Sequence, residues 1–150
     1  FDRVRRAGVV DRHVDGLYVA TSNAGRDESI EFWRAAGETG LPFANPRLFP
    51  WTLANSPTGA IAKALDVHGP TYTLVGGVDA VIGAIEHAID DLADGTVMSA
   101  AVVAVDLVDG EPAVAAVLLE SVDAARDLAD RVPVTDPRAG PVAILRSCGR

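Results

Sequence analysis

Apolar runs of strand length alternate along this chain with segments whose apolar residues recur at helical spacing. The strand-like runs cover residues 17–21, 71–75, 98–107 and 113–119, and helical segments separate or follow most of them. Strands that alternate with helices in this way are typical of α/β proteins, in which helices pack on a central sheet. The order of the segments therefore predicts an α/β fold.

The size and composition of the chain indicate one folded domain. A chain of 150 residues has room for one hydrophobic core, and 49% hydrophobic residues with 23% charged residues are typical of a globular protein. The sequence contains no internal repeat and no low-complexity linker. We therefore expect a single domain over residues 1–150.

The charge and the cysteine content exclude several classes of protein. A net charge of −8 repels nucleic acid and anionic lipid, and no apolar run approaches the roughly 20 residues that cross a bilayer. The single cysteine, Cys148, cannot form an internal disulfide, which is typical of a reducing compartment. The first residues also lack the apolar stretch of a signal peptide. We expect a cytoplasmic protein without nucleic acid or membrane partners.

The first helix is expected after the turn at residues 22–25. Asp27 can cap its first amides, and Ile30, Trp33 and Ala36 fall on one face. Residues 41–51 contain three prolines and predict an irregular loop. Its apolar residues are expected to dock on another surface: Phe43, Leu48, Phe49 and Trp51.

The second half of the chain shows stronger periodicity. Helices are expected over residues 56–65 and 122–131, and an apolar stripe from Val78 to Leu92 predicts the longest helix, which Gly95 closes. The runs 98–107 and 113–119 are joined by five residues, and so short a connection predicts an antiparallel pair. Residues 142–145 are a last possible strand.

One segment of the chain carries a family resemblance. Residues 48–62 read Leu-Phe-Pro-Trp-Thr-Leu-Ala-Asn-Ser-Pro-Thr-Gly-Ala-Ile-Ala, and Gly69-Pro70 follows further along the chain. This order resembles the segment of β-ketoacyl synthases and chain-length factors in which Asn, a small residue and Gly precede a short helix and a Gly-Pro. Glu111-Pro112-Ala113 and the strand ending in Leu119-Glu120 continue the resemblance. It implies half of a thiolase-like fold, with a mixed, mostly parallel sheet, an antiparallel edge strand and helices on both faces.

The resemblance also implies that the chain lacks the chemistry of the family. Active ketosynthases carry a nucleophilic cysteine eight residues after the proline, at the start of the long helix, and this position is Val78. The family's two catalytic histidines belong to a second half that has no counterpart here, and its first strand and helix are missing. The sheet would then be completed by residues 142–145 or by another chain. We expect a non-catalytic subunit, similar to a chain-length factor, in polyketide or fatty-acid-type biosynthesis.

In this family the strand before the nucleophile pairs with its twin across a dimer axis. The resemblance therefore implies an interface with a second copy or with a catalytic ketosynthase, formed by Thr71, Tyr72, Thr73, Leu74 and Val75 together with Phe49 and Trp51. Asn55, Gly76, Gly77 and Val78 would line an acyl cavity. The alternative is that residues 71–75 form an internal strand, because a buried apolar strand has the same pattern.

Enzymatic alternatives must use other groups. Gly76-Gly77 could hold an oxyanion at a helix N-terminus, although such a pair is more often just a tight turn. His87 precedes Asp90 and Asp91 on the polar helix face, where a solvated histidine is the more common case. The remaining candidates are weaker: Asp11, His13 and Asp15 as metal ligands, His68 in a turn, and Cys148 between Arg146 and Arg150 near a mobile end.

Two further hypotheses concern partners and ligands. Acyl carrier proteins are acidic, and the basic cluster that could dock one is Arg3, Arg5, Arg6 and Arg12. A stand-alone module that binds a small molecule or acyl group is the alternative to a subunit, as is an enzyme of altered chemistry on the same fold. The chain carries no dinucleotide, Walker or zinc motif, so we expect no cofactor and no metal.

Overall fold

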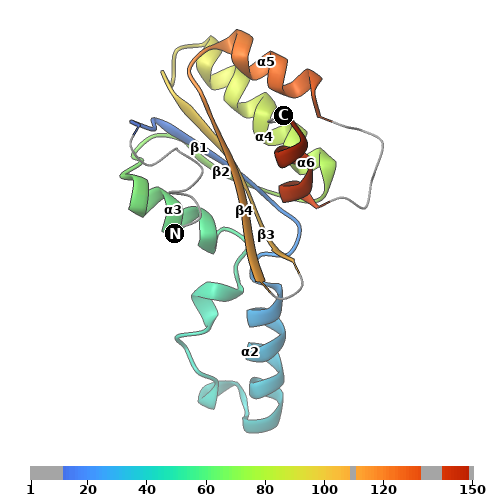
Figure 1. The fold of residues 1–150 in the computed structure, drawn as a ribbon. Coiled ribbons are helices and arrows are strands. Elements are labelled where there is room, and N and C mark those ends of the chain that lie inside the picture. The colour runs from blue at the N-terminus through green and yellow to red at the C-terminus, as the bar shows by residue number, and fades with distance from the viewer. Residues whose placement is uncertain (1–11, 109–110, 133–139, 149–150) are drawn as a thin grey trace.

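The computed structural model describes residues 12–108, 111–132 and 140–148. Its centre is a four-stranded sheet of order β2-β1-β3-β4 (Figure 1), built from β1 (Gly16–Thr21), β2 (Thr71–Val75), β3 (Ala100–Val108) and β4 (Glu111–Leu119). β1 runs parallel to β2 and β3, and β3 runs antiparallel to β4. The expected mixed, mostly parallel sheet with an antiparallel edge strand is confirmed.

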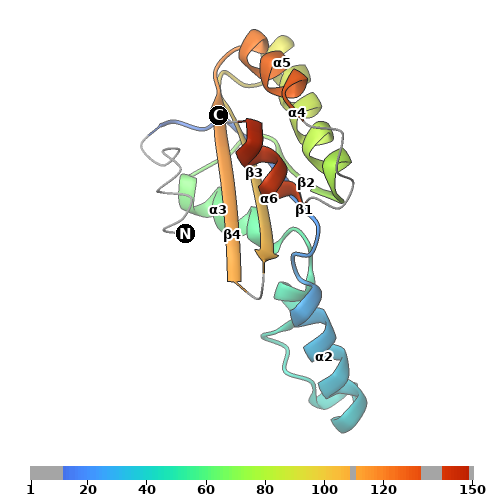
Figure 2. The same ribbon diagram turned by 45° about the vertical axis from the view of Figure 1, so that its right-hand side comes forward.

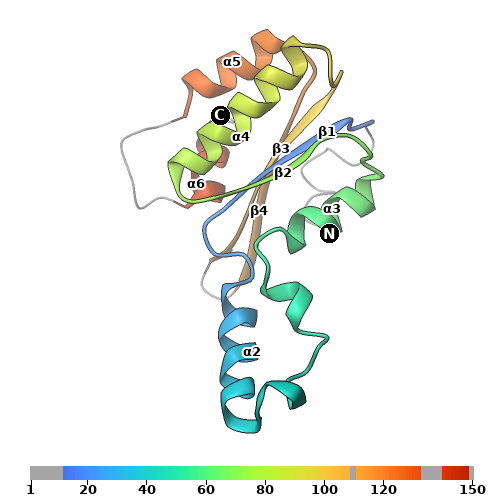
Figure 3. The same cartoon turned by 180° about the vertical axis from the view of Figure 1, so that it is seen from behind.

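Helices cover both faces of the sheet, as expected. α3 (Ser56–Leu65) lies on one face, and α4 (Val78–Ala93), α5 (Val122–Asp130) and α6 (Pro141–Cys148) lie on the other (Figure 3). The side chains of β1 alternate between these layers: Leu17 and Val19 pack toward α3, whereas Tyr18 and Ala20 pack toward α4. Each face of the central strands therefore has its own hydrophobic cluster.

α4 follows the apolar stripe seen in the sequence. Its buried residues are Ala80, Val81, Ala84, Ile85 and Ala88, and Val78, Ile82, Ile89 and Leu92 flank them. Small residues on the facing strand, Ala100 and Ala104 among them, let the helix approach the sheet closely. The stripe at i, i+3, i+4 and i+7 spacing thus predicted both the helix and the face it buries.

Residues 142–145 are helical, so the predicted last strand is wrong. They belong to α6, where Val142, Ile144, Leu145 and Cys148 are buried against the sheet. A four-residue apolar run fits a short strand and a buried helix equally well, and only its neighbours decide between them. Residues 142–145 therefore add no strand to the sheet, whereas completion of the sheet by another chain stays a prediction.

α2 (Arg26–Thr39) and the turns η1 (Leu41–Phe43) and η2 (Phe49–Thr52) extend away from the sheet layers (Figure 2). We call residues 26–52 the arm. Phe32 and Ala36 are buried in α2, where Phe32 contacts Phe49 edge to face. Of the expected face, Ala36 is buried as predicted, whereas the prediction is wrong for Ile30 and Trp33, which are 57% and 59% exposed.

The start of α2 also differs from the sequence prediction. Gly25 is the N-cap residue, with a left-handed φ of 78°, and no side chain caps the helix. Asp27 lies within the first turn, where its carboxylate interacts favourably with the positive end of the helix dipole. A Cβ at Gly25 would lie 2.8 Å from the Thr52 carbonyl oxygen, so glycine lets the arm fold back on itself here.

Candidate functional site

β2 is the outer strand of the sheet in the part of the chain that the structure describes. Among the described residues it pairs with β1 alone, so within them it is not an internal strand. Thr71, Tyr72 and Val75 are exposed, and Thr73 and Leu74 are half-buried. The five strand residues that the sequence singled out for an interface thus lie along one open edge, whereas Phe49 and Trp51 lie in η2 of the arm.

The hydrogen bonds of β2 leave alternate backbone groups free to pair again. The Leu17 N–H donates to the Pro70 carbonyl, and the Gly76 N–H donates to the Thr21 carbonyl. Residues 70 and 76 therefore point their backbone groups at β1, as do 72 and 74 between them. The backbone N–H and carbonyl groups of Thr71, Thr73 and Val75 point away from β1, which is the arrangement that a further strand needs for pairing.

Three aromatic rings form a stack from the core to the surface beside this edge. The Tyr18 and Tyr72 rings lie 5.6 Å apart, and the Tyr72 and His87 rings 4.7 Å apart and nearly parallel. The Tyr18 hydroxyl donates to Asp91 Oδ2 at 2.6 Å, and burial together with this carboxylate raises the pKa of Tyr18. Asp91 thus bonds Tyr18, and His87 is exposed on the polar face of α4, as the more common case for such a histidine predicted.

α4 begins at Val78, directly after the edge strand. Gly76 has a positive φ of 153° and Gly77 is the N-cap residue, so the glycine pair makes the turn from strand to helix. The Gly76 N–H is already bonded to β1, which leaves fewer amides for an oxyanion. Val78 is half-buried and packs against the core, and its side chain carries no group that can bond an acyl chain.

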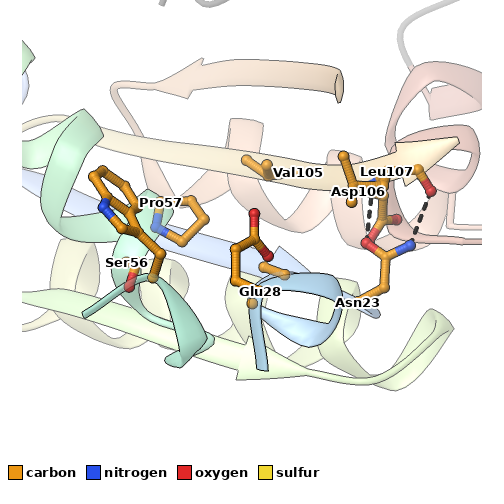
Figure 4. Close-up of a pocket in the computed structure, with 10 residues that line it drawn as sticks. Asn23, Glu28, Ser56, Pro57, Val105, Asp106 and Leu107 are labelled. Carbon is orange, nitrogen blue, oxygen red and sulfur yellow. Dashed lines mark hydrogen bonds between the residues drawn. The ribbon is translucent and has the colours of Figure 1, made fainter. Parts of the chain in front are cut away.

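A pocket of about 170 Å³ opens where β1 and β3 end (Figure 4). β3, the first turn of α2 and the start of α3 surround it, and its walls include Asn23, Glu28, Trp51, Ser56 and Asp106. Asn55, Gly76, Gly77 and Val78 are not among its lining residues. The sequence predictions did not anticipate this pocket.

Asp106 and Asn23 hold β1 and β3 together at the floor of the pocket. Asp106 is 4% exposed, and its Oδ1 accepts bonds from the Ser22 N–H at 2.7 Å and the Ser22 hydroxyl at 2.9 Å. Asn23 exchanges two 2.8 Å bonds with the backbone of Leu107. Asp106 is a lone carboxylate within an otherwise apolar strand, and this sequence signal could have indicated the cluster.

The structure places only some of the weaker sequence candidates, and two of these, Arg12 and His68, form exposed pairs. Asp11 and the cluster residues Arg3, Arg5 and Arg6 lie outside the described residues, and Arg12 forms an exposed ion pair with Glu120. His68 pairs with Asp66 at the end of α3. Within residues 12–108, 111–132 and 140–148, no group of three or more His, Cys, Asp or Glu is placed to hold a metal ion.

The sequence suggested a mobile end at Cys148, but this residue is buried in α6. It is 2% exposed, its thiol contacts the Ile144 carbonyl oxygen at 3.3 Å, and burial raises the pKa of the thiol. A buried thiol with a raised pKa is a poor nucleophile because little of it is thiolate. Cys148 therefore remains the weak candidate nucleophile that the sequence indicated.

Asp15 joins the start of β1 to the residues before β3. Its Oδ2 accepts bonds from the Met98 and Ser99 N–H groups at 3.0 Å, and His13 lies 2.7 Å from Oδ1. Partial burial opposes ionisation, but these hydrogen bonds and the His13 charge outweigh it and lower the pKa of Asp15. The side chain thus acts as a structural clamp.

Asp15→Asn is expected to lower the Tm at pH 7 by about 3 °C and to flatten its acid dependence. A carboxyl whose folded pKa lies below its unfolded value of about 3.9 stabilises the fold fully above that value, and the gain is lost as pH falls through the folded pKa. Thermal unfolding from pH 7 to about pH 2.5 measures this effect. Glu31→Gln, an exposed carboxyl in α2, is the control, and equal curves for both variants would contradict the clamp.

The fold described above is an α/β layer structure that matches part of the ketosynthase fold. The ishigamide ketosynthase/chain length factor aligns with 84% of this chain at 19% identity and a TM-score of 0.57. The ketosynthase ApeO in complex with its chain length factor ApeC, from Xenorhabdus doucetiae, aligns with 79% at 17% identity and a TM-score of 0.60.

These matches show the fold and cover only part of the longer proteins. The chain spans 32% of the first matched chain and 52% of the second. No family model matches the sequence, and no curated protein does. Among the described residues, no helix is long and apolar enough to cross a membrane.

Proposed function

We propose that this chain is a non-catalytic, ketosynthase-like subunit, comparable to a chain-length factor, in polyketide or fatty-acid-type biosynthesis. The observation that carries the proposal is Val78, an apolar residue at the first position of α4, directly after the outer strand of a ketosynthase-like sheet. The sequence resemblance puts a nucleophilic cysteine at this position in active ketosynthases. A valine there cannot form a bond to an acyl chain, so the proposal assigns binding and assembly to this chain.

The partner is a second ketosynthase-like chain, either catalytic or identical. The free backbone groups of β2 favour pairing with another strand, and the arm adds exposed aromatic area at Phe49 and Trp51, which are 51% and 53% exposed. Exposed aromatic side chains are typical of protein interfaces. The second matched structure is itself a complex of a ketosynthase with its chain length factor.

The proposed acyl cavity forms only when the partner is present. Asn55, Gly76, Gly77 and Val78 all retain solvent exposure in this chain alone, so a second chain can cover them without rearranging the core. Native mass spectrometry of the tagged protein from its source cells tests the assignment. A ketosynthase subunit or a bound acyl group supports it, and a strict monomer without ligand contradicts it.

Val75→Pro is expected to weaken association at least tenfold while the isolated chain stays folded. The Val75 N–H faces away from β1, so proline removes a donor for the partner strand and none for β1. Sedimentation velocity of the variant, alone and mixed with a purified ketosynthase, measures the loss. Val75→Thr keeps the N–H and the branched shape and should associate like the parent chain, whereas an unchanged Val75→Pro complex would rule out pairing through β2.

A further inference from the structure

The pocket between β1 and β3 lies at the position where open α/β sheets bind ligands. The chain leaves β1 for β2 on one side, with α3 on one face, and returns to β3 on the other side, with α4 on the opposite face. The carboxyl ends of β1 and β3 therefore separate at a topological switch point, where a crevice forms. Asn23, directly beyond β1, and Leu107, near the end of β3, line the pocket found there.

The size of the pocket limits what it can hold. Its volume of about 170 Å³ equals the liquid volume of roughly six water molecules, whereas sites for larger ligands usually exceed about 300 Å³. A long acyl chain does not fit, but a small head group or one inserted side chain does. This pocket is thus separate from the acyl cavity proposed above.

The charge of the walls selects for a cation. Glu28 lies in the first turn of α2 and is half-buried. Its carboxylate has no ion pair or hydrogen bond within the described residues. Figure 4 shows its carboxylate between Pro57 and Asn23, pointing toward Val105. Asp106 also lines the pocket, but its Oδ1 already accepts hydrogen bonds from Ser22 and Thr21. Glu28 therefore supplies the charge that a ligand would meet, and it repels an anion although two helices begin nearby.

The apolar walls favour a flat and weakly hydrated cation. The Trp51 ring and Pro57 border the pocket on the α3 side, and Trp51 is half-exposed. A guanidinium group stacks on an indole ring and donates paired hydrogen bonds to a carboxylate, whereas an ammonium group is a compact and strongly hydrated charge. Both features of the guanidinium group match this combination of walls.

We propose that the pocket at the ends of β1 and β3 binds a guanidinium group, held by Glu28 and stacked on Trp51. The group belongs either to a small free ligand or to an arginine side chain of a protein partner, since both present the same chemistry. This inference does not depend on the assignment of the chain as a ketosynthase-like subunit, because it uses the pocket and Glu28 of this chain alone. Trp51 is the one residue that it shares with the proposed interface.

The first test is an NMR titration with ethylguanidinium chloride. Binding should shift the backbone amides of residues 23–28 and 105–107 with a Kd in the millimolar range, as expected for one exposed charge pair and one stacked ring. N-ethylurea, which has a similar shape and no charge, should not shift them, and butylammonium should bind more weakly. Shifts spread over the whole surface, or none, would overturn the proposal.

Variants identify the residues that hold the group. Glu28→Gln should weaken ethylguanidinium binding at least tenfold, and Trp51→Leu should weaken it several-fold. Asp27→Asn is the matched control, because it removes the same charge from the same helical turn at an exposed position and should bind like the parent chain. Equal losses for Glu28→Gln and Asp27→Asn would show general charge attraction and overturn the site.

A capped tripeptide with a central arginine separates the two sources of the group. If the pocket accepts a side chain from a protein partner, the peptide should bind at least as tightly as ethylguanidinium. If it accepts a free ligand, the peptide backbone should hinder entry and binding should be at least tenfold weaker. Failure of both probes to bind overturns the proposal.

Discussion

Asp106→Ala is expected to lower the free energy of unfolding by about 3 kcal/mol. The carboxylate is buried, and its Oδ1 accepts two bonds from Ser22 and a longer one, at 3.4 Å, from the buried Thr21 hydroxyl. Alanine removes all three hydrogen bonds and leaves the donor groups of Ser22 and Thr21 beside a cavity. Urea denaturation followed by circular dichroism measures the change as a lower midpoint at constant slope.

Asp106→Asn is the control for this prediction. Asparagine keeps the size of the side chain and one acceptor oxygen for Ser22, so about 1 kcal/mol should be lost. If both variants lost the same amount, the hydrogen bonds to Oδ1 would not be the source of the stability. An alanine variant within 0.5 kcal/mol of the parent chain, roughly the usual range for surface substitutions, would contradict the role of Asp106 altogether.

Local periodicity carried most of the fold prediction. The stripe from Val78 to Leu92 and the alternation in Thr71–Val75 depend only on residues close in sequence, and both elements form as expected. The short connection between β3 and β4 permits only an antiparallel pair, which is also observed. These features needed no knowledge of the tertiary structure.

The errors lie where tertiary contacts decide between local alternatives. Residues 142–145 are equally apolar in a strand or in α6, and burial against β3 and β4 selects the helix. In α2 the buried residue is Phe32 and not Trp33, because Phe49 from η2 folds back against it. Neither contact is visible in a window of ten residues.

The pocket could not be predicted from the sequence for a related reason. Asp106 and Ser22 are 84 residues apart, and they meet only because β1 and β3 are neighbours in the sheet. No local pattern in the sequence gives the order of the strands. By contrast, the interface residues of β2 and the position of Val78 follow one another in the chain, so the sequence could propose them together.

Gly69→Ala is expected to be the most destabilising small substitution, with a loss of about 4 kcal/mol. A Cβ at this position would lie 2.2 Å from the Asp15 carbonyl oxygen, far inside contact distance. Asp15 cannot withdraw, because its backbone N–H donates to the Ser99 carbonyl and its carboxylate accepts from the Ser99 N–H. The turn before β2 must move instead, which breaks the 2.9 Å bond from the Leu17 N–H to Pro70.

Gly37→Ala is the matched control and should change stability in the opposite direction. Gly37 lies within α2, and a Cβ there meets no atom within 4 Å, so alanine should stabilise the chain by about 0.5–1 kcal/mol through its helix propensity. Thermal unfolding of the two variants separates a steric effect from a general effect of added methyl groups. A Gly69→Ala variant as stable as the parent chain would show that β1 and β2 do not approach as closely as the Gly69–Asp15 contact requires.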